Sequence, residues 1–331
     1  MVLKNSKIVI PASFVVLVAI FIALWFSRPN SSVINVGSST ANPNAPDKKI
    51  TRAGSTTQAG VTLPTLTTPS SIDDSPGRQL ARLYSSSTDK RKFFDEALRR
   101  PQDGGYFLAS TVEIECGANK PLGTVGTIER KNKLVPIDAP DRAMRLEAIK
   151  KIHEPCAGFD TSPINFKLGE LAVEGVKAGD PVFKVRNDLK NAFADNGDLS
   201  TLPGILKAAS EANNPYVVQE ALSSLVINAN KTGLAINDHQ VVGADAQALI
   251  ISASLVACQF GRDCSSNSYA ALQYCTGGDS CGSDLYELVR QNGLPPSEFN
   301  KAMTFHNQFV EMFRTGNFSG ISVKPKMQLT K

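Results

Sequence analysis

The chain has little histidine and lacks the short motifs that mark many catalytic and metal-binding proteins. Its 331 residues hold three histidines and one tryptophan. No C-x-x-C pair, no Walker A loop and no dinucleotide-binding glycine fingerprint occurs in the sequence. These absences argue against thioredoxin-type redox chemistry, c-type haem attachment and nucleotide binding through the usual loops. We therefore predict no metal site and no cofactor.

Positive and negative charges are also nearly balanced over most of the chain. Residues 1–76 hold six Lys and Arg against three Asp and Glu, a surplus of +3. Since the net charge of the whole chain is +4, only +1 remains for residues 77–331. Nucleic-acid-binding domains normally cluster Lys and Arg on one surface. The basic stretch that begins at Lys90 is interleaved with acidic residues, so we interpret it as a solvated helix face and expect no nucleic-acid partner.

One long apolar run stands near the N-terminus. Residues 8–27 contain no charged side chain, and a membrane-spanning helix needs about 20 such residues. Lys4 and Lys7 precede the run, which predicts that the tail 1–7 stays in the cytoplasm. A cleaved signal peptide is the alternative, but the run ends in LWFSRPN, without a small-residue cleavage site. We expect residues 8–27 to be an uncleaved transmembrane signal anchor.

Residues 28–76 are rich in Ser, Thr, Pro, Gly and Asn and show no sustained periodicity. Such a composition predicts a disordered linker, because it buries too little apolar surface to offset the entropy of ordering. Residues 77–331 are then an extracytoplasmic domain, and the expected location is the inner (cytoplasmic) membrane with this domain in the periplasm. In organisation and composition the chain resembles uncharacterised membrane-anchored envelope proteins of Gram-negative bacteria, a resemblance that supplies no function.

Helical periodicity dominates residues 77–331, and alternating strand patterns are scarce. Helix starts are predicted at Asp180, Asp198 and Asn214, because Asp and Asn accept hydrogen bonds from the first free amides of a helix. Their even spacing is typical of stacked helical hairpins. Further helices are expected at 105–116, from 142 onward, and at 244–258, 267–275, 283–292 and 297–314. The predicted fold class is mainly α, either a helical-hairpin repeat or an irregular helical bundle.

One of these hairpins has a family resemblance. The stretch LPGILKAASEANNPYVVQEALSSLV, residues 202–226, resembles a single HEAT-type repeat at Leu202-Pro203, at the turn before Pro215 and at Leu222. It departs from that family at Val218, where an arginine is usual. The resemblance implies a helical hairpin that stacks on its neighbours. Any amphipathic pair of helices has the same apolar spacing and is the alternative.

The six cysteines are the most specific feature of the predicted periplasmic domain. Their spacing lacks the short cysteine pairs and the histidines of common zinc sites, and an even count outside the cytoplasm indicates disulfides. Cys116 and Cys156 both fall at predicted helix ends, and 117–140 is long enough to bring these ends together, so we expect them to pair. The other four allow a crossed pairing, 258 with 275 and 264 with 281, or an adjacent one. The predicted disulfide residues are Cys116, Cys156, Cys258, Cys264, Cys275 and Cys281.

A serine-hydrolase pattern occurs once. GDSCG, residues 278–282, fits G-x-S-x-G with Ser280 as nucleophile, and Asp284 and His306 follow in the order Ser, Asp, His. This pattern has meaning only at a sharp turn between a strand and a helix. The preceding residues AALQYCT indicate a helix, so we predict that Ser280 is not a nucleophile. His306 lies on an apolar helix face, which favours a buried or boundary position.

Two hypotheses for function remain. The first is a membrane-tethered extracytoplasmic helical scaffold that binds a protein or peptide partner, and it requires no catalytic residue. The alternative is an envelope hydrolase with a non-motif active site built on His153, His239 or His306. We favour the scaffold, because helical hairpins offer surfaces for extended partners and no catalytic spacing occurs.

Overall fold

The computed structural model of the chain describes residues 75–117, 121–161, 169–194, 197–229, 233–241, 244–278, 280–292 and 295–324. They belong to one compact unit, Pro64–Lys331. The predicted tail 1–7, the predicted span 8–27 and nearly all of the linker 28–76 lie outside these described residues. Within the described residues, no helix has both the length and the hydropathy of a membrane span.

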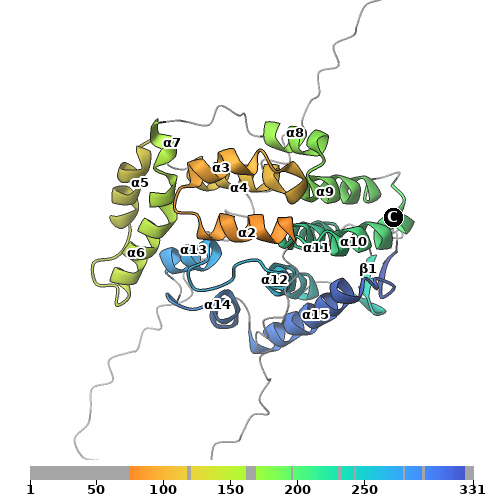
Figure 1. The fold of residues 1–331 in the computed structure, drawn as a ribbon. Helices are drawn as coiled ribbons and strands as arrows, with labels where there is room; N and C mark the ends of the chain where they lie inside the picture. The colour runs from red at the N-terminus through yellow and green to blue at the C-terminus, as the bar shows by residue number, and fades with distance from the viewer. Residues whose placement is uncertain are drawn as a thin grey trace, which may run out of the picture. The chain divides into compact units, whose positions relative to one another are not determined.

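The fold is mainly helical, as predicted (Figure 1). Three short 3₁₀ helices, η1 (Pro101–Asp103), η2 (Glu154–Cys156) and η3 (Leu199–Thr201), join some of the α-helices. The α-helices are α2 (Pro76–Ser86), α3 (Lys90–Ala97), α4 (Gly105–Gly117), α5 (Gly123–Asn132), α6 (Arg142–His153), α7 (Gly158–Thr161), α8 (Glu170–Ala178), α9 (Pro181–Ala192), α10 (Leu202–Glu211), α11 (Pro215–Ala229), α12 (Ala244–Gln259), α13 (Tyr269–Gly277), α14 (Leu285–Asn292) and α15 (Pro296–Thr315).

The predicted helix starts are confirmed, and their capping bonds explain them. The Asp180 carboxylate accepts hydrogen bonds from the amides of Val182 and Phe183 at 2.9 and 3.2 Å. Asn214 caps α11, and Asp198 caps η3, which leads into α10. Ser75 caps α2, whose first residue is Pro76. The first described helix therefore begins one residue before the predicted boundary at residue 77.

Most apolar side chains gather in one cluster, which we call the main core. It is formed chiefly by α2–α4, α9–α12 and α15, and Phe94, Leu108 and Leu225 are among its fully buried members. Helix α11 packs against α2, α9, α10 and α12. The segment 202–226 is thus a helical hairpin of α10 and α11, and its second helix is buried among several others. A smaller cluster lies around Tyr286 and Phe299.

The structure contains a small antiparallel sheet that the sequence analysis did not predict. Its strands are β1 (Gly233–Ile236), β2 (His239–Gln240) and β3 (Ile321–Lys324), in the order β2-β1-β3. Asn237 and Asp238 join β1 to β2 with positive φ at both positions, 48° and 64°. This is the conformation of the tightest hairpin turns, which favour Asn, Asp and Gly. Strands of four and two residues are too short to show alternation.

Helices α5 and α6 form a hairpin, residues 122–153, beside the rest of the domain (Figure 1). Helix α5 was not predicted, because the stretch 117–140 has few apolar residues at helical spacing. It packs against α6 and η2, and α6 packs against α13. Four buried apolar residues of the hairpin belong to neither apolar cluster: Val135, Ala148, Ile149 and Ile152.

Candidate functional site

All six cysteines are paired. Cys116 bonds to Cys156 across a sequence separation of 40, as predicted. Within 258–281 the structure has the adjacent pairing, Cys258 with Cys264 and Cys275 with Cys281, each across a separation of 6. The crossed alternative is therefore wrong. Adjacent pairing closes two small loops, one after α12 and one after α13, and leaves no free thiol.

The cysteine-rich segment packs on α6. Arg145 donates a hydrogen bond from Nη2 to the Gly278 carbonyl at 3.2 Å, and Lys151 Nζ donates to Asn267 Oδ1 at 2.9 Å. Gly278 has φ of +107°, and a Cβ there would stand 3.0 Å from Arg145 Nη1. The loop closed by Cys275 and Cys281 therefore contacts α6, as does Asn267 before α13. The bond of Cys116 to Cys156 joins the two ends of the segment that carries the α5–α6 hairpin.

Ser280 is not at a nucleophile elbow. It follows α13 rather than a strand. Asp284 caps α14 by accepting a hydrogen bond from the Glu287 amide at 2.9 Å. His306 is buried, and its Nε2 lies 3.0 Å from the hydroxyl of Tyr286. Within the part of the chain that the structure describes, no hydrogen bond joins Ser280 to Asp284 or to His306.

The three histidines have separate structural surroundings. His153 is buried, and its Nδ1 has no hydrogen-bond partner. The pKa of His153 is lowered to about 4, chiefly by burial and further by the nearby charges of Lys131 and Arg130. Burial also lowers the pKa of His306. His239 is exposed and lies 3.1 Å from the carboxylate of Asp245. Among the described residues, no hydrogen bond connects one of these histidines to another or to Ser280.

Lys90 forms a buried polar cluster, which corrects its interpretation as part of a solvated helix face. Its Nζ donates to the Tyr84 carbonyl at 2.9 Å and lies 3.8 Å from Glu115 Oε2. The Tyr84 hydroxyl donates to the other oxygen of Glu115. Burial raises the pKa of Glu115 and lowers that of Lys90. Because the two charges compensate each other, this pair stabilises the contact of α2, α3 and α4 as long as both partners are present.

Exposed apolar side chains are frequent in the α5–α6 hairpin. Ten large apolar residues are exposed in the described part of the chain, and five of them lie between positions 122 and 144. The side chains of Ile137, Leu134 and Val125 are 91%, 75% and 69% exposed. Soluble proteins normally scatter such residues singly, so a group on one element indicates an interaction surface. We call this set the hairpin surface: Leu122, Val125, Leu134, Ile137 and Met144.

Cationic side chains accompany the hairpin surface. Arg130, Lys131 and Lys133 stand between Val125 and Leu134 in the sequence. Some cations of the domain are paired, such as Arg145 with Asp141 at 2.8 Å, whereas others, such as Lys92 and Lys190, make no ion pair with a described residue. The three at 130–133 make no ion pair with any described residue. Glu129 and Asp138 stand in the same stretch, so the hairpin surface is apolar with charges of both signs near it in the sequence, and with a small excess of positive charge.

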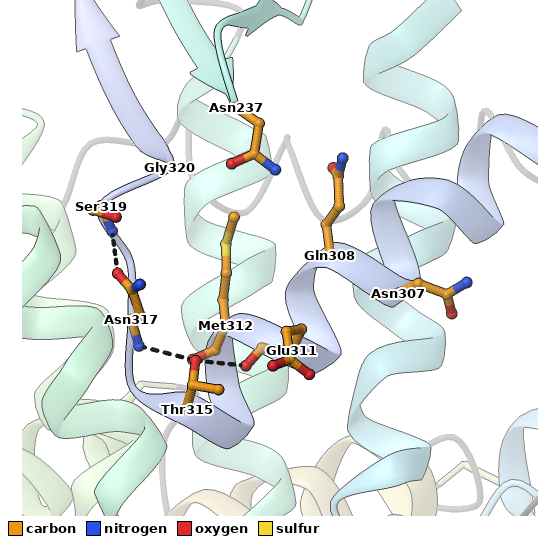
Figure 2. A pocket seen from close by; sticks show the side chains of 9 residues that line it. All are labelled: Asn237, Asn307, Gln308, Glu311, Met312, Thr315, Asn317, Ser319 and Gly320. Carbon is orange, nitrogen blue, oxygen red and sulfur yellow. Dashed lines mark hydrogen bonds between the residues drawn. The ribbon is translucent and has the colours of Figure 1, made fainter.

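A polar pocket of about 490 Å³ lies between α15, the β1–β2 turn and the connection from α15 to β3 (Figure 2). Its walls carry carboxamides, hydroxyls and one carboxylate. In Figure 2, Gln308 and Met312 rise from α15 on the side where the turn presents Asn237. The lining residues are Asn237, Asn307, Gln308, Glu311, Met312, Thr315, Asn317, Ser319 and Gly320.

Comparisons with protein-family models, curated proteins and solved structures find no match to this chain. The HEAT-type resemblance of 202–226 therefore stays a prediction. Function has to be argued from the two features just described, the hairpin surface and the polar pocket. Sequence reasoning found neither, because exposure depends on which side of each helix the rest of the domain covers.

Proposed function

We propose that the chain is a membrane-tethered extracytoplasmic helical scaffold, and that it binds a protein or peptide partner on the hairpin surface. The observation that carries this proposal is the gathering of five exposed large apolar side chains on one hairpin. Burying one such side chain fully contributes about 1.5–3 kcal/mol. Covering Val125, Leu134 and Ile137 together would therefore contribute about 4.5–9 kcal/mol, which offsets a large part of the roughly 4–15 kcal/mol that association costs.

The attachment of the hairpin supports this function. The bond of Cys116 to Cys156 closes the segment that carries α5 and α6, and Cys281 closes a loop that packs on α6. Binding costs less free energy when a surface is already held in its bound conformation. A pair of helices with few buried apolar residues of its own gains this rigidity from covalent bonds.

Charge indicates the chemistry of the partner. Arg130, Lys131 and Lys133 make no ion pair with a described residue and accompany the apolar set. Complementary charge raises association rates and fixes orientation more than it raises affinity. We therefore expect the partner to present an apolar surface with Asp or Glu beside it.

The predicted topology is consistent with this proposal. Three disulfides suit an oxidising compartment such as the periplasm. The apolar run at 8–27 would tether the protein to the inner membrane, and the predicted linker 28–76 would let the domain search for a partner near the bilayer. As a flexible coil, a linker of this length spans roughly 40 Å.

A matched pair of substitutions tests the site. Ile137→Asp places a charge on the hairpin surface, whereas Ile227→Asp places the same charge on another exposed isoleucine, 59% accessible on α11. Partner recovery is measured by quantitative mass spectrometry after crosslinking and purification of the full chain from cell envelopes. Ile137→Asp should weaken recovery of the partner at least about tenfold. Equal recovery with both variants would place the partner elsewhere.

A further inference from the structure

The packing of the α5–α6 hairpin, residues 122–153, buries little apolar surface. Its helices have 10 and 12 residues, and helices of this length are marginal in water without packing. The buried apolar residues of the hairpin are the four already named, and the α13 helix on which α6 packs has only Ala271 and Cys275 buried. Both are small side chains. The hydrophobic contribution that keeps the hairpin closed is therefore small.

The closed hairpin also contains buried polar atoms without a partner. Four of its side-chain atoms are buried and make no hydrogen bond with a described residue: Thr127 Oγ1, Asn132 Oδ1, Arg142 Nε and His153 Nδ1. Each has lost its hydrogen bonds to water and gained none, which destabilises the closed packing. If the hairpin opened, all four would be hydrated again.

His153 lies where the hairpin joins the rest of the domain. It ends α6, it is followed directly by η2, and η2 contains Cys156, which is bonded to Cys116. The His153 side chain is buried, with 5% of its surface exposed. A change of charge at this residue therefore acts at the contact between α6, α5 and η2.

The groups around His153 oppose a positive charge on its ring. The residues that carry charge nearby are Glu129, Arg130 and Lys131 on α5, Glu147, Lys150 and Lys151 on the second half of α6, and Glu154 on η2. Helix α13 contributes none. Glu154 is paired with Lys150 at 3.7 Å, and no carboxylate is bonded to His153 in the described part of the chain. Burial and then the charges of Lys131 and Arg130 lower the pKa of His153 to about 4.

We propose that the α5–α6 hairpin is an acid-sensitive switch, in which uptake of a proton by His153 opens residues 122–153 as one unit while the rest of the domain stays folded. The protonated ring has no counter-charge in the closed hairpin, so the proton binds to the open state and shifts the equilibrium toward it. The bond of Cys116 to Cys156 closes the base of this unit. Opening therefore stops there, as a local unfolding of one contiguous segment.

The switch regulates the hairpin surface, and in this role it rests on the proposed function. The surface is preorganised for a partner only while the hairpin is closed, so partner and proton favour opposite states. A partner is then held near neutral pH and released in acid. The opening itself needs no partner and is measured on the free protein, so its failure would leave partner binding at the hairpin surface untouched.

Hydrogen exchange of the full-length protein in detergent, measured by mass spectrometry, tests the opening. Exchange at pH 7.5 and at pH 5.5 is compared after correction for the pH dependence of free amides. Since the pKa of His153 is 6.5 when solvated and about 4 in the closed hairpin, the opening constant of α5 and α6 should rise about tenfold over this range. Peptides from α11 and α12 should not change. An equal change in both regions, or none in the hairpin, would overturn the proposal.

A matched pair of histidine variants identifies the trigger. His153→Leu should abolish the pH dependence of exchange in α5 and α6, because it removes the group that takes up the proton. His239→Leu makes the same change at an exposed histidine on β2 and should keep the pH dependence. Persistence of the pH dependence in His153→Leu would contradict the proposal.

A second pair tests the effect of the unpaired polar atoms. Thr127→Val keeps the shape of a fully buried side chain and removes its unpaired hydroxyl, so exchange in α5 and α6 should slow at least about fivefold at both pH values. Ser252→Ala removes another buried, unpaired hydroxyl, on α12, and should not slow exchange in the hairpin. Unchanged or faster exchange in Thr127→Val would contradict the view that these atoms weaken the closed hairpin.

Discussion

The α5–α6 hairpin exposes large apolar side chains to solvent, whereas the main core buries them. In the main core, residues such as Phe94, Leu108 and Leu225 are almost completely inaccessible to solvent. In the hairpin, Ile137 and Leu134 are largely exposed. The main core is held together by packing of many helices. The hairpin has few buried apolar residues; it packs on α13 and η2, and the bond of Cys116 to Cys156 joins the ends of the segment that carries it.

This difference indicates which side chains of the domain can be substituted without loss of packing. A core side chain cannot change without loss of packing, whereas the outside of a covalently attached hairpin can change without unfolding the domain. The three disulfides are not spread evenly. Cys116–Cys156 joins the end of α4 to η2, and Cys275–Cys281 closes the loop after α13, the helix that packs on α6, whereas Cys258–Cys264 closes the loop after α12. Two of the three bonds therefore lie next to the α5–α6 hairpin.

The sharpest contrast compares two leucines. Leu225→Ala in α11 removes a fully buried side chain, and we expect it to lower the free energy of unfolding by about 2–5 kcal/mol. Leu134→Ala, in the loop between α5 and α6, should change it by less than about 0.5 kcal/mol. Chemical denaturation of both variants measures the difference. Similar losses in the two variants would mean that the hairpin is as tightly packed as the core.

The contribution of each disulfide to the free energy of unfolding should depend on the length of chain that it closes. Replacing Cys116 and Cys156 with serine removes a cross-link across 40 residues, which corresponds to about 4 kcal/mol in the chain-entropy description. Replacing Cys258 and Cys264 removes one across 6 residues, which corresponds to about 2 kcal/mol. Denaturation of the two double variants checks the order. An equal loss would contradict the view that the long bond is what holds the hairpin.

A third prediction concerns pH. The pKa of His153 is lowered from 6.5 to about 4, so the unfolded chain takes up a proton below pH 6.5 while the folded domain stays neutral at this position until about pH 4. Stability should therefore fall as the pH drops through this range, by at most about 3 kcal/mol. His153→Gln should show a smaller fall. Identical pH profiles for the two proteins would rule out His153 as the cause.

Local features of the fold could be predicted from the sequence. Asp180 and Asn214 marked helix starts because their capping bonds reach only two or three residues along the chain. The pairing of Cys116 with Cys156 followed from their places at helix ends. Helix α5, the β-sheet and the burial of Lys90 depend on contacts between distant segments, which periodicity does not report. The pair Asn237-Asp238 is a local sequence signal for a hairpin turn, but by itself it does not predict the strands that pair on either side of it.

The candidate sites were less predictable than the fold. Ile137 and Leu134 look in the sequence like core residues, but they stand in the connection between α5 and α6 and are largely exposed. The prediction of a buried or boundary position for His306 on α15 is confirmed, because His306 and its neighbours Phe305 and Phe309 are buried.

Site-specific photocrosslinking tests the central claim most directly. A benzophenone side chain is placed at Ile137 or Val125 on the hairpin surface, and at Ile227 or Val173 as exposed controls, in full-length protein in cells. The account predicts an adduct with one partner protein from positions 137 and 125, little from 227 and 173, and a loss of the adduct when Cys116 and Cys156 are replaced. Equal adducts from all four positions, or adducts with lipid alone at 137 and 125, would contradict it.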